Sequence, residues 1–247
     1  PRGGHTSLVM NNRMWVIGGF DGSRMNDVWY SSDGIAWTQA TTAADFSARS
    51  GHSSAVFDNK MWVIAGGDLN DCINDAWYST DGIAWTQATS AADFSSRFGH
   101  TSVVFDNKMW VIGGKYINGN NINWPQENDV WCSCDGIMWV QTSGASCLPS
   151  RSGHTSVVFD KNIWVIGGWD YGITTDDTNY LDDVWCSPDG MRWIKVSDSA
   201  GFSARAGHTS VVFNNKMWVI GGTSEGKMKN DVWYSFVATS TSHYVSL

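Results

Sequence analysis

Short apolar runs separated by polar turn residues follow one another along the chain. The fullest example reads GHTSVVFDNKMWVIGG, from Gly99 to Gly114. It contains two runs of β-branched and aromatic residues, which favour strands, joined by Asp-Asn-Lys, which favours a tight hairpin. The second run is apolar almost without alternation, so we expect a strand that is covered on both faces. No stretch has a helical period long enough to compete.

Four such runs make a unit that occurs five times. The copies align on histidines that lie 47 to 54 residues apart, which indicates a repeat architecture. These histidines are His5, His52, His100, His154 and His208. Variants of NDVWYS and IAWTQ predict a third and a fourth strand, and the Asp-Gly between them predicts a second hairpin. We therefore predict an all-β fold, a β-propeller of five four-stranded antiparallel blades with an atypical last blade.

A pair of glycines ends each predicted second strand. The pairs are Gly18-Gly19, Gly66-Gly67, Gly113-Gly114, Gly167-Gly168 and Gly221-Gly222. With the spaced aromatics that follow, such as Trp29 and Trp37, and the Arg-x-Gly-His opening, the unit resembles the kelch repeat. The hairpin YSSDGIAWT is instead similar to the Asp-box turn of sialidase-type propellers. The resemblance covers Arg2 to about Ser235 and implies a propeller, but kelch propellers host enzymes and binding modules alike.

The repeats imply one continuous propeller domain over residues 1–247. We place the repeats at about 2–49, 50–97, 98–151, 152–205 and 206–247. The last copy has neither an Asp-Gly turn nor a tryptophan after Ser235, and Ser242–Leu247 is its candidate fourth strand. Two interpretations follow: a complete five-bladed ring with an atypical closing blade, or part of a longer array. Terminal repeats are often atypical, which favours the first.

Composition excludes several partners. The formal charge of −8 argues against nucleic-acid binding, and no apolar run approaches the length of a membrane span. The cysteines are Cys72, Cys132, Cys134, Cys147 and Cys186. Their odd number and irregular spacing do not predict a disulfide framework or a metal site. We expect a monomer without cofactor or metal.

Two loops carry the best candidate for a binding site. Strand order brings the second-to-third loops and the blade-to-blade connections to one face, and the tight hairpins to the other. The second-to-third loops of blades three and four, Lys115–Asn128 and Trp169–Asp182, are longer than the others. Their aromatic residues outside the repeat pattern are Tyr116, Trp124, Trp169, Tyr171 and Tyr180. Such residues serve protein and sugar binding sites alike, or alternatively pin their own loops.

A ring of arginines is a second candidate site. Its members are Arg2, Arg49, Arg97, Arg151 and Arg205. Converging guanidiniums could hold a carboxylate or a phosphate. However, an aspartate opens every third strand, at Asp27, Asp75, Asp129, Asp183 and Asp231. An arginine and an aspartate that repeat in step favour an ion pair within each blade. The repeated histidines favour hydrogen bonds to the backbone of a neighbouring blade over metal binding.

No nucleophile–base pair, phosphate loop or metal-ligand spacing is present. We therefore predict a non-enzymatic scaffold that recognises a protein partner through the long loops of blades three and four. The alternative is a lectin-like propeller that stacks a glycan on the loop aromatics. The resemblance also allows a sialic-acid-processing or galactose-oxidase-like enzyme, which we favour less.

Overall fold

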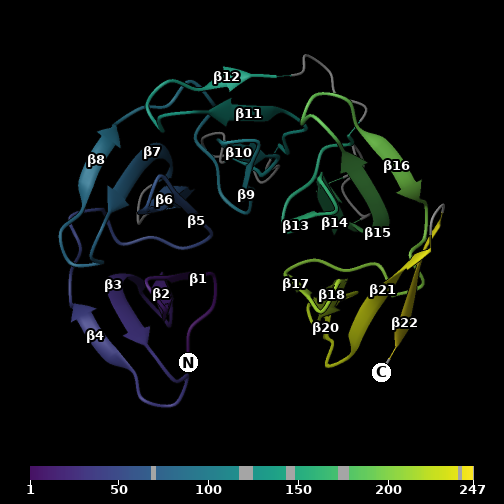
Figure 1. The fold of residues 1–247 in the computed structure, drawn as a ribbon, viewed down its shortest axis with the longest axis horizontal. Helices are drawn as coiled ribbons and strands as arrows, with labels where there is room; N and C mark the ends of the chain where they lie inside the picture. The colour runs from purple at the N-terminus through teal and green to yellow at the C-terminus, as the bar shows by residue number, and fades with distance from the viewer. Residues whose placement is uncertain (68–70, 117–124, 143–147, 172–177, 239–240, 247) are drawn as a thin grey trace. The chain divides into compact units, whose positions relative to one another are not determined.

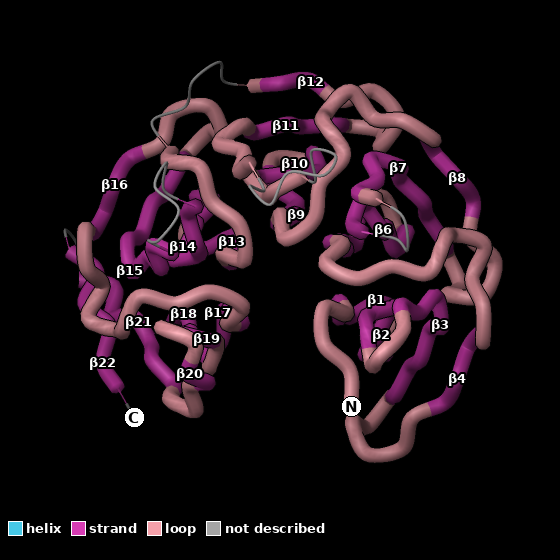
Figure 2. The backbone as a smooth tube through the Cα atoms, turned by 180° about the vertical axis from the view of Figure 1, so that it is seen from behind, coloured by secondary structure: helices cyan, strands magenta, loops and turns pink. Residues whose placement is uncertain are grey.

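The computed structural model describes residues 1–67, 71–116, 125–142, 148–171, 178–238 and 241–246. This part of the chain consists of strands, turns and loops (Figure 2). Over these ranges no helix is long and apolar enough to cross a membrane. The strands build five four-stranded sheets and one small two-stranded sheet (Figure 1). The predicted all-β fold, a β-propeller of five four-stranded antiparallel blades, is confirmed.

The strands of each blade follow one another in space as they do in sequence. Blade one contains β1 (Thr6–Met10), β2 (Arg13–Phe20), β3 (Arg24–Ser31) and β4 (Thr38–Thr41). Blade two contains β5 (Ser53–Phe57), β6 (Lys60–Gly67), β7 (Cys72–Ser79) and β8 (Thr86–Thr89). Blade three contains β9 (Thr101–Phe105), β10 (Lys108–Ile112), β11 (Val130–Ser133) and β12 (Val140–Gln141).

The last two blades continue this order. Blade four contains β13 (Thr155–Phe159), β14 (Asn162–Tyr171), β15 (Thr178–Ser187) and β16 (Ile194–Ser197). Blade five contains β17 (Thr209–Phe213), β18 (Lys216–Ile220), β21 (Val232–Ala238) and β22 (Thr241–Ser246). The small sheet pairs β19 (Thr223–Ser224) with β20 (Lys227–Met228). Strand β22 supplies the fourth strand of the atypical last blade, close to where the sequence placed it.

The chain divides into two compact units. The first comprises residues 1–109 and 132–140, and the second comprises residues 110–131 and 141–247. Within the first unit, the first strands of neighbouring blades contact each other, β1 with β5 and β5 with β9. Within the second unit, β13 contacts β17 in the same way. The single domain over residues 1–247 stays a prediction.

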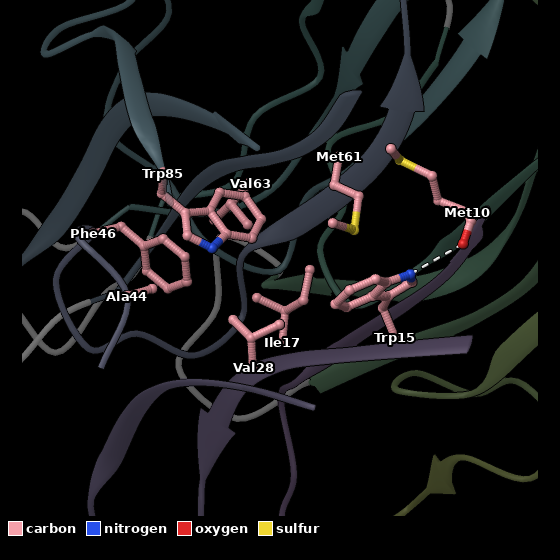
Figure 3. Close-up of a cluster of buried hydrophobic side chains, with 9 residues drawn as sticks. All are labelled: Met10, Trp15, Ile17, Val28, Ala44, Phe46, Met61, Val63 and Trp85. Carbon is pink, nitrogen blue, oxygen red and sulfur yellow. Dashed lines mark hydrogen bonds between the residues drawn. The ribbon is translucent and has the colours of Figure 1, made fainter. Parts of the chain in front are cut away.

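A hydrophobic cluster between blades one and two shows how a blade covers its neighbour (Figure 3). Its members are Met10, Trp15, Ile17, Val28, Ala44, Phe46, Met61, Val63 and Trp85. The first four belong to blade one, the next two to the connection, and the last three to blade two. Trp15 Nε1 donates to Met10 O at 3.1 Å, so its buried polar atom has a partner. The repeat tryptophans Trp15 and Trp85 thus fill the space between blades.

The hairpins between first and second strands are as tight as predicted. Asn11 and Asn12 join β1 to β2 with φ of 52° and 59°. Two consecutive positive φ angles define the type I′ turn, which suits the twist of a hairpin and explains the Asn and Asp residues. The corresponding pairs are Asp58-Asn59, Asp106-Asn107, Asp160-Lys161 and Asn214-Asn215.

The hairpins between third and fourth strands are fixed by hydrogen bonds of their serine and aspartate side chains. In blade one, Ser31 Oγ donates to Asp33 Oδ1 at 3.0 Å and accepts from the Gly34 N–H at 2.8 Å. Asp33 Oδ1 also accepts from the N–H groups of Ile35 at 2.8 Å and Ala36 at 2.9 Å. These backbone donors lower the pKa of Asp33. Equivalent bonds are made by Ser79 with Asp81, Ser133 with Asp135 and Ser187 with Asp189.

The glycine of this turn also packs against the preceding blade. A Cβ on Gly136 would lie 2.2 Å from the ring of Trp62, nearer than atoms can approach. Gly82 and Gly190 have the same relation to second-strand tryptophans, at 2.2 and 2.1 Å. Glycine therefore provides both the positive φ of the turn and the room for the neighbouring indole.

The prediction of a long loop over residues 169–182 is wrong at both ends, where the chain continues as strand. Strands β14 and β15 are longer than the other strands of blade four. They stay paired with each other beyond a register shift between Ile166 and Gly168, up to Tyr171 and Thr178. Trp169 lies opposite Tyr180, and Tyr171 lies opposite Thr178. Blade four therefore extends as a β-ribbon, while residues 172–177 lie outside the described residues.

Candidate functional site

The second-to-third loops and the blade-to-blade connections meet at one end of a blade, as predicted. In blade two, Ser50 N donates to Gly67 O at 3.1 Å, and Gly67 N donates to Ser50 O at 2.9 Å. In blade four, Ser152 and Trp169 exchange the same two bonds, at 3.0 and 2.9 Å. A strand end held on both sides is a rigid base for variable residues.

The ribbon of blade four presents two of the predicted aromatics together. Trp169 and Tyr180 are directly opposite residues of β14 and β15, so their side chains share one face of the ribbon. Both side chains are half-buried. Tyr171 lies two residues beyond Trp169 in the strand, and its side chain is outside the described part of the structure.

The described part of the blade-three loop reaches this ribbon. Lys115 Nζ lies 4.5 Å from the centre of the Trp169 ring, within the range of a cation–π contact. Ser150 Oγ, from the connection into blade four, donates to Asp170 Oδ1 at 3.0 Å. Tyr116 is half-buried, and its N–H donates to Pro125 O at 3.2 Å. The structure thus joins the described ends of the two long loops.

Two features of this site escaped the sequence interpretation. Lys115 was not singled out, although it and Trp169 hold the same repeat position, directly after the paired glycine. That shared position was the signal that could have found it. The contact of Ser150 with Asp170 had no sequence signal. Trp124 lies outside the described residues.

The arginines form the ion pairs that their spacing with aspartate predicts. Arg49 is fully buried, and its Nη1 and Nη2 donate to Asp75 Oδ1 at 2.6 Å and Oδ2 at 2.9 Å. The remaining donors of Arg49 bind Ala65 O, Ser47 O and Ser47 Oγ, so all five N–H groups have partners. The other described pairs are Arg2–Asp27, Arg151–Asp183 and Arg205–Asp231.

Two of these carboxylates have a lowered pKa although they are partly buried. Burial opposes the ionisation of Asp183, but hydrogen bonds from Arg151 and the Trp185 indole outweigh it and lower its pKa. The pKa of Asp27 is lowered against burial in the same way, by Arg2 and the Trp29 indole. An external anion would have to displace such a carboxylate. Ligand binding by the arginines, including the buried Arg97, stays a prediction.

The repeated histidines bind a neighbouring blade. His52 Nε2 and Thr6 Oγ1 are 3.0 Å apart, and His208 Nε2 and Thr155 Oγ1 are 2.9 Å apart. Burial and the nearby arginine lower the pKa of both histidines to about 3, so both are neutral. The neighbouring blade was predicted correctly, although the partner is a side-chain hydroxyl. No three His, Cys, Asp or Glu side chains of the described residues are grouped to hold a metal ion.

Comparison with known proteins gives one family. A family model of the KLHDC2/KLHL20/DRC7 Kelch-repeats domain matches residues 1–114 and again residues 99–247. The chain is similar to Tip elongation aberrant protein 1 of Schizosaccharomyces pombe, with 28% identity over 121 residues, 44% of this chain and 10% of that protein. Tip elongation aberrant protein 3 of the same organism is 32% identical over 88 residues, 34% and 8% of the two chains. The matches therefore span a tenth or less of these relatives' length.

Proposed function

We propose that this chain, which belongs to the kelch-repeat family, is a non-catalytic scaffold that binds a protein partner through the long loops of blades three and four. Kelch-repeat domains are typically interaction scaffolds. The observation that carries the proposal is the ribbon of blade four, which presents Trp169 and Tyr180 on one face beside Lys115. Tryptophan and tyrosine are enriched among the residues that dominate the binding energy of protein interfaces.

The remaining polar groups of the repeat favour a scaffold over an enzyme. His52 is buried, neutral and hydrogen-bonded to the neighbouring blade. The guanidinium of Arg49 has a partner for each of its donors, which leaves it no donor for substrate. The residues that differ between blades are those of the loops, and specificity follows from them.

Glycan binding is the second candidate, and the pairing of Trp169 with Tyr180 beside Asp170 favours it. Sugar rings stack on indole faces, and carboxylates accept hydrogen bonds from their hydroxyl groups. Lys115 already lies over one face of the Trp169 ring, so a sugar would have to displace it or use the other face. A protein partner can instead accept both side chains together, which is why we place protein recognition first.

The test compares the affinity of a captured partner for the parent chain and for Trp169→Ala/Tyr180→Ala. Loss of two interface anchors at about 2 kcal/mol each weakens Kd by more than about 100-fold. The matched control is Ile83→Ala/Ile137→Ala, which truncates exposed side chains in the Asp-Gly hairpins and leaves Kd unchanged. A glycan array run with the same proteins separates the two candidates. Partner binding that survives the loop variant contradicts the proposal.

A further inference from the structure

Blade three carries a pair of cysteines beside a lysine. Cys132 is the third residue of β11, and Cys134 follows the last residue of that strand. Residues two apart in a strand project to the same face, and the two thiols lie close enough to interact electrostatically. Cys134 is exposed, whereas Cys132 is half-buried. A reagent in solution therefore reaches Cys134 first.

The lysine occupies a position that places a cation over a tyrosine ring in three other blades. In those blades the cation lies 4.0 to 4.9 Å from the centre of the ring. The pairs are Arg13–Tyr30, Lys60–Tyr78 and Lys216–Tyr234. In blade three the cation is Lys108, and Cys132 stands in place of the tyrosine. Burial raises the pKa of the Cys132 thiol, and the Lys108 ammonium opposes this rise.

Blade four provides a natural contrast to this arrangement. Cys186 holds the same repeat position as Cys132, but Asn162 and Pro188 stand where blade three has its lysine and its second cysteine. Burial raises the pKa of the Cys186 thiol as well. At these repeat positions, Cys132 has a cation and a second thiol beside it, and Cys186 has neither.

The spacing of the two cysteines in blade three suits a disulfide bond. Two residues of extended strand span about 6.6 Å between Cα atoms, and disulfides join Cα atoms about 4.4–6.8 Å apart. Cys134 lies one residue beyond β11, at a bend of the chain. A small adjustment at this bend brings the sulfur atoms together and leaves the pairing of β11 intact.

We propose that Cys132 and Cys134 form a site of reversible thiol–disulfide exchange with small disulfides such as glutathione disulfide, a function separate from the loops of blades three and four. The Cys134 thiolate attacks one sulfur of the small disulfide, whose S–S bond breaks and releases one thiolate. Cys132 then loses its proton and attacks Cys134 Sγ, which releases the second thiolate. The protein gives up two protons and two electrons, and the small disulfide is reduced to two thiols.

Lys108 assists the second of these steps. The thiolate is the form of cysteine that attacks a disulfide, and a nearby ammonium stabilises its negative charge. The half-buried Cys132 needs this help more than the exposed Cys134 does, because burial disfavours its thiolate. Without the lysine, the mixed disulfide on Cys134 should persist. Since each step is an exchange, an excess of small thiol reverses both.

The test incubates the purified chain with glutathione disulfide, blocks the remaining thiols and follows the tryptic peptides by mass spectrometry. A Cys147→Ser background leaves the proposed pair as the only cysteines of the peptide over residues 116–151. We expect this peptide to lose two hydrogens without a lasting glutathione adduct, and excess reduced glutathione to restore them. The peptide over residues 162–192, which contains Cys186, is the internal control and should react at least about tenfold more slowly.

Variants separate the roles of the three residues. Cys132→Ser should keep the glutathione adduct on Cys134, because the second thiol is missing. Cys134→Ser should slow the reaction at least about tenfold, because the remaining thiol is half-buried. Lys108→Asn should prolong the adduct severalfold, and Lys108→Arg should restore the behaviour of the parent. Blade one has serine at the position of Cys134, and blade four has asparagine at that of Lys108, so both variants should fold.

The outcomes distinguish exchange at this pair from ordinary thiol chemistry. A parent peptide that stays reduced, or that ends with glutathione adducts and no internal disulfide, overturns the proposal. Reaction of Cys186 at the rate of the blade-three pair also overturns it, because the lysine and the second thiol would then contribute nothing. An adduct lifetime that Lys108→Asn leaves unchanged contradicts the role given to Lys108.

Discussion

Replacing Asp75 with Asn should strongly destabilise the fold. The carboxylate accepts two hydrogen bonds from Arg49, at 2.6 and 2.9 Å, and one from the Trp77 indole at 2.7 Å. Asparagine has nearly the same shape, but it has no charge and turns an NH₂ group toward these donors. The guanidinium of Arg49, which is fully buried, would then keep its charge without a counter-ion.

The expected loss of unfolding free energy is large for one polar substitution. Breaking a buried pair by removing one partner costs about 3–5 kcal/mol. The control is Asp58→Asn, which removes an exposed pair in which Lys60 Nζ lies 3.3 Å from Asp58 Oδ2. Asparagine also tolerates the positive φ of that turn position, so the control should lose no more than about 1 kcal/mol.

The assay is urea unfolding followed by tryptophan fluorescence, with the midpoint shift compared at unchanged m-value. A second variant, Arg49→Met/Asp75→Leu, removes both charges and should recover part of the stability lost in Asp75→Asn. If Asp75→Asn loses no more stability than Asp58→Asn, the pairs do not hold the blades, and the reasoning from the buried guanidinium fails.

Three further predictions concern pH, blade contacts and thiols. His52 stays neutral in the fold down to about pH 3 but takes up a proton below about pH 6.5 when unfolded. The free energy of unfolding should therefore fall between these pH values as the pH drops, by about 1.4 kcal/mol per pH unit. His52→Gln should reduce this dependence on pH. If urea unfolding at several pH values gives the same dependence for the variant and the parent, His52 is not the neutral buried group described here. Gly136→Ala should lower the free energy of unfolding by about 1–3 kcal/mol more than Gly34→Ala. The two glycines have nearly equal φ angles, 75° and 77°, but only Gly136 faces an indole ring. Equal melting temperatures of the two variants would disprove the contact. Cys134 is exposed, whereas burial raises the pKa of the Cys186 thiol. Iodoacetamide should therefore label Cys134 before Cys186, as peptide mass spectrometry can check, and faster labelling of Cys186 would refute this.

The repeat made most of the fold predictable from sequence. Each copy of the repeat has the same strand-favouring and turn-favouring residues. A local signal that would be weak in one copy is therefore supported by the other four. Asn11 and Asn12 favour a hairpin because they tolerate positive φ angles. Asp33 favours another hairpin because its side chain accepts hydrogen bonds from nearby backbone N–H groups. The pairing of Arg49 with Asp75 was found because the two residues repeat in step.

The candidate site was less predictable because it consists of residues that differ between the copies of the repeat. Residues 169–171 and 178–182 carry no turn signal that separates a loop from a continued strand, and they pair only because the underlying sheet aligns them. The contact of Lys115 with Trp169 joins two blades and depends on that pairing.

The central claim is that the ribbon of blade four is a protein-recognition surface. The most direct measurement places a photoreactive benzoylphenylalanine at Tyr180 in one protein and at the exposed Ile83 in another, and identifies the adducts formed on irradiation with partner mixtures. The account predicts a defined protein adduct from position 180 that is absent from position 83. Adducts of equal identity and yield at both positions, or adducts from position 83 alone, would contradict it.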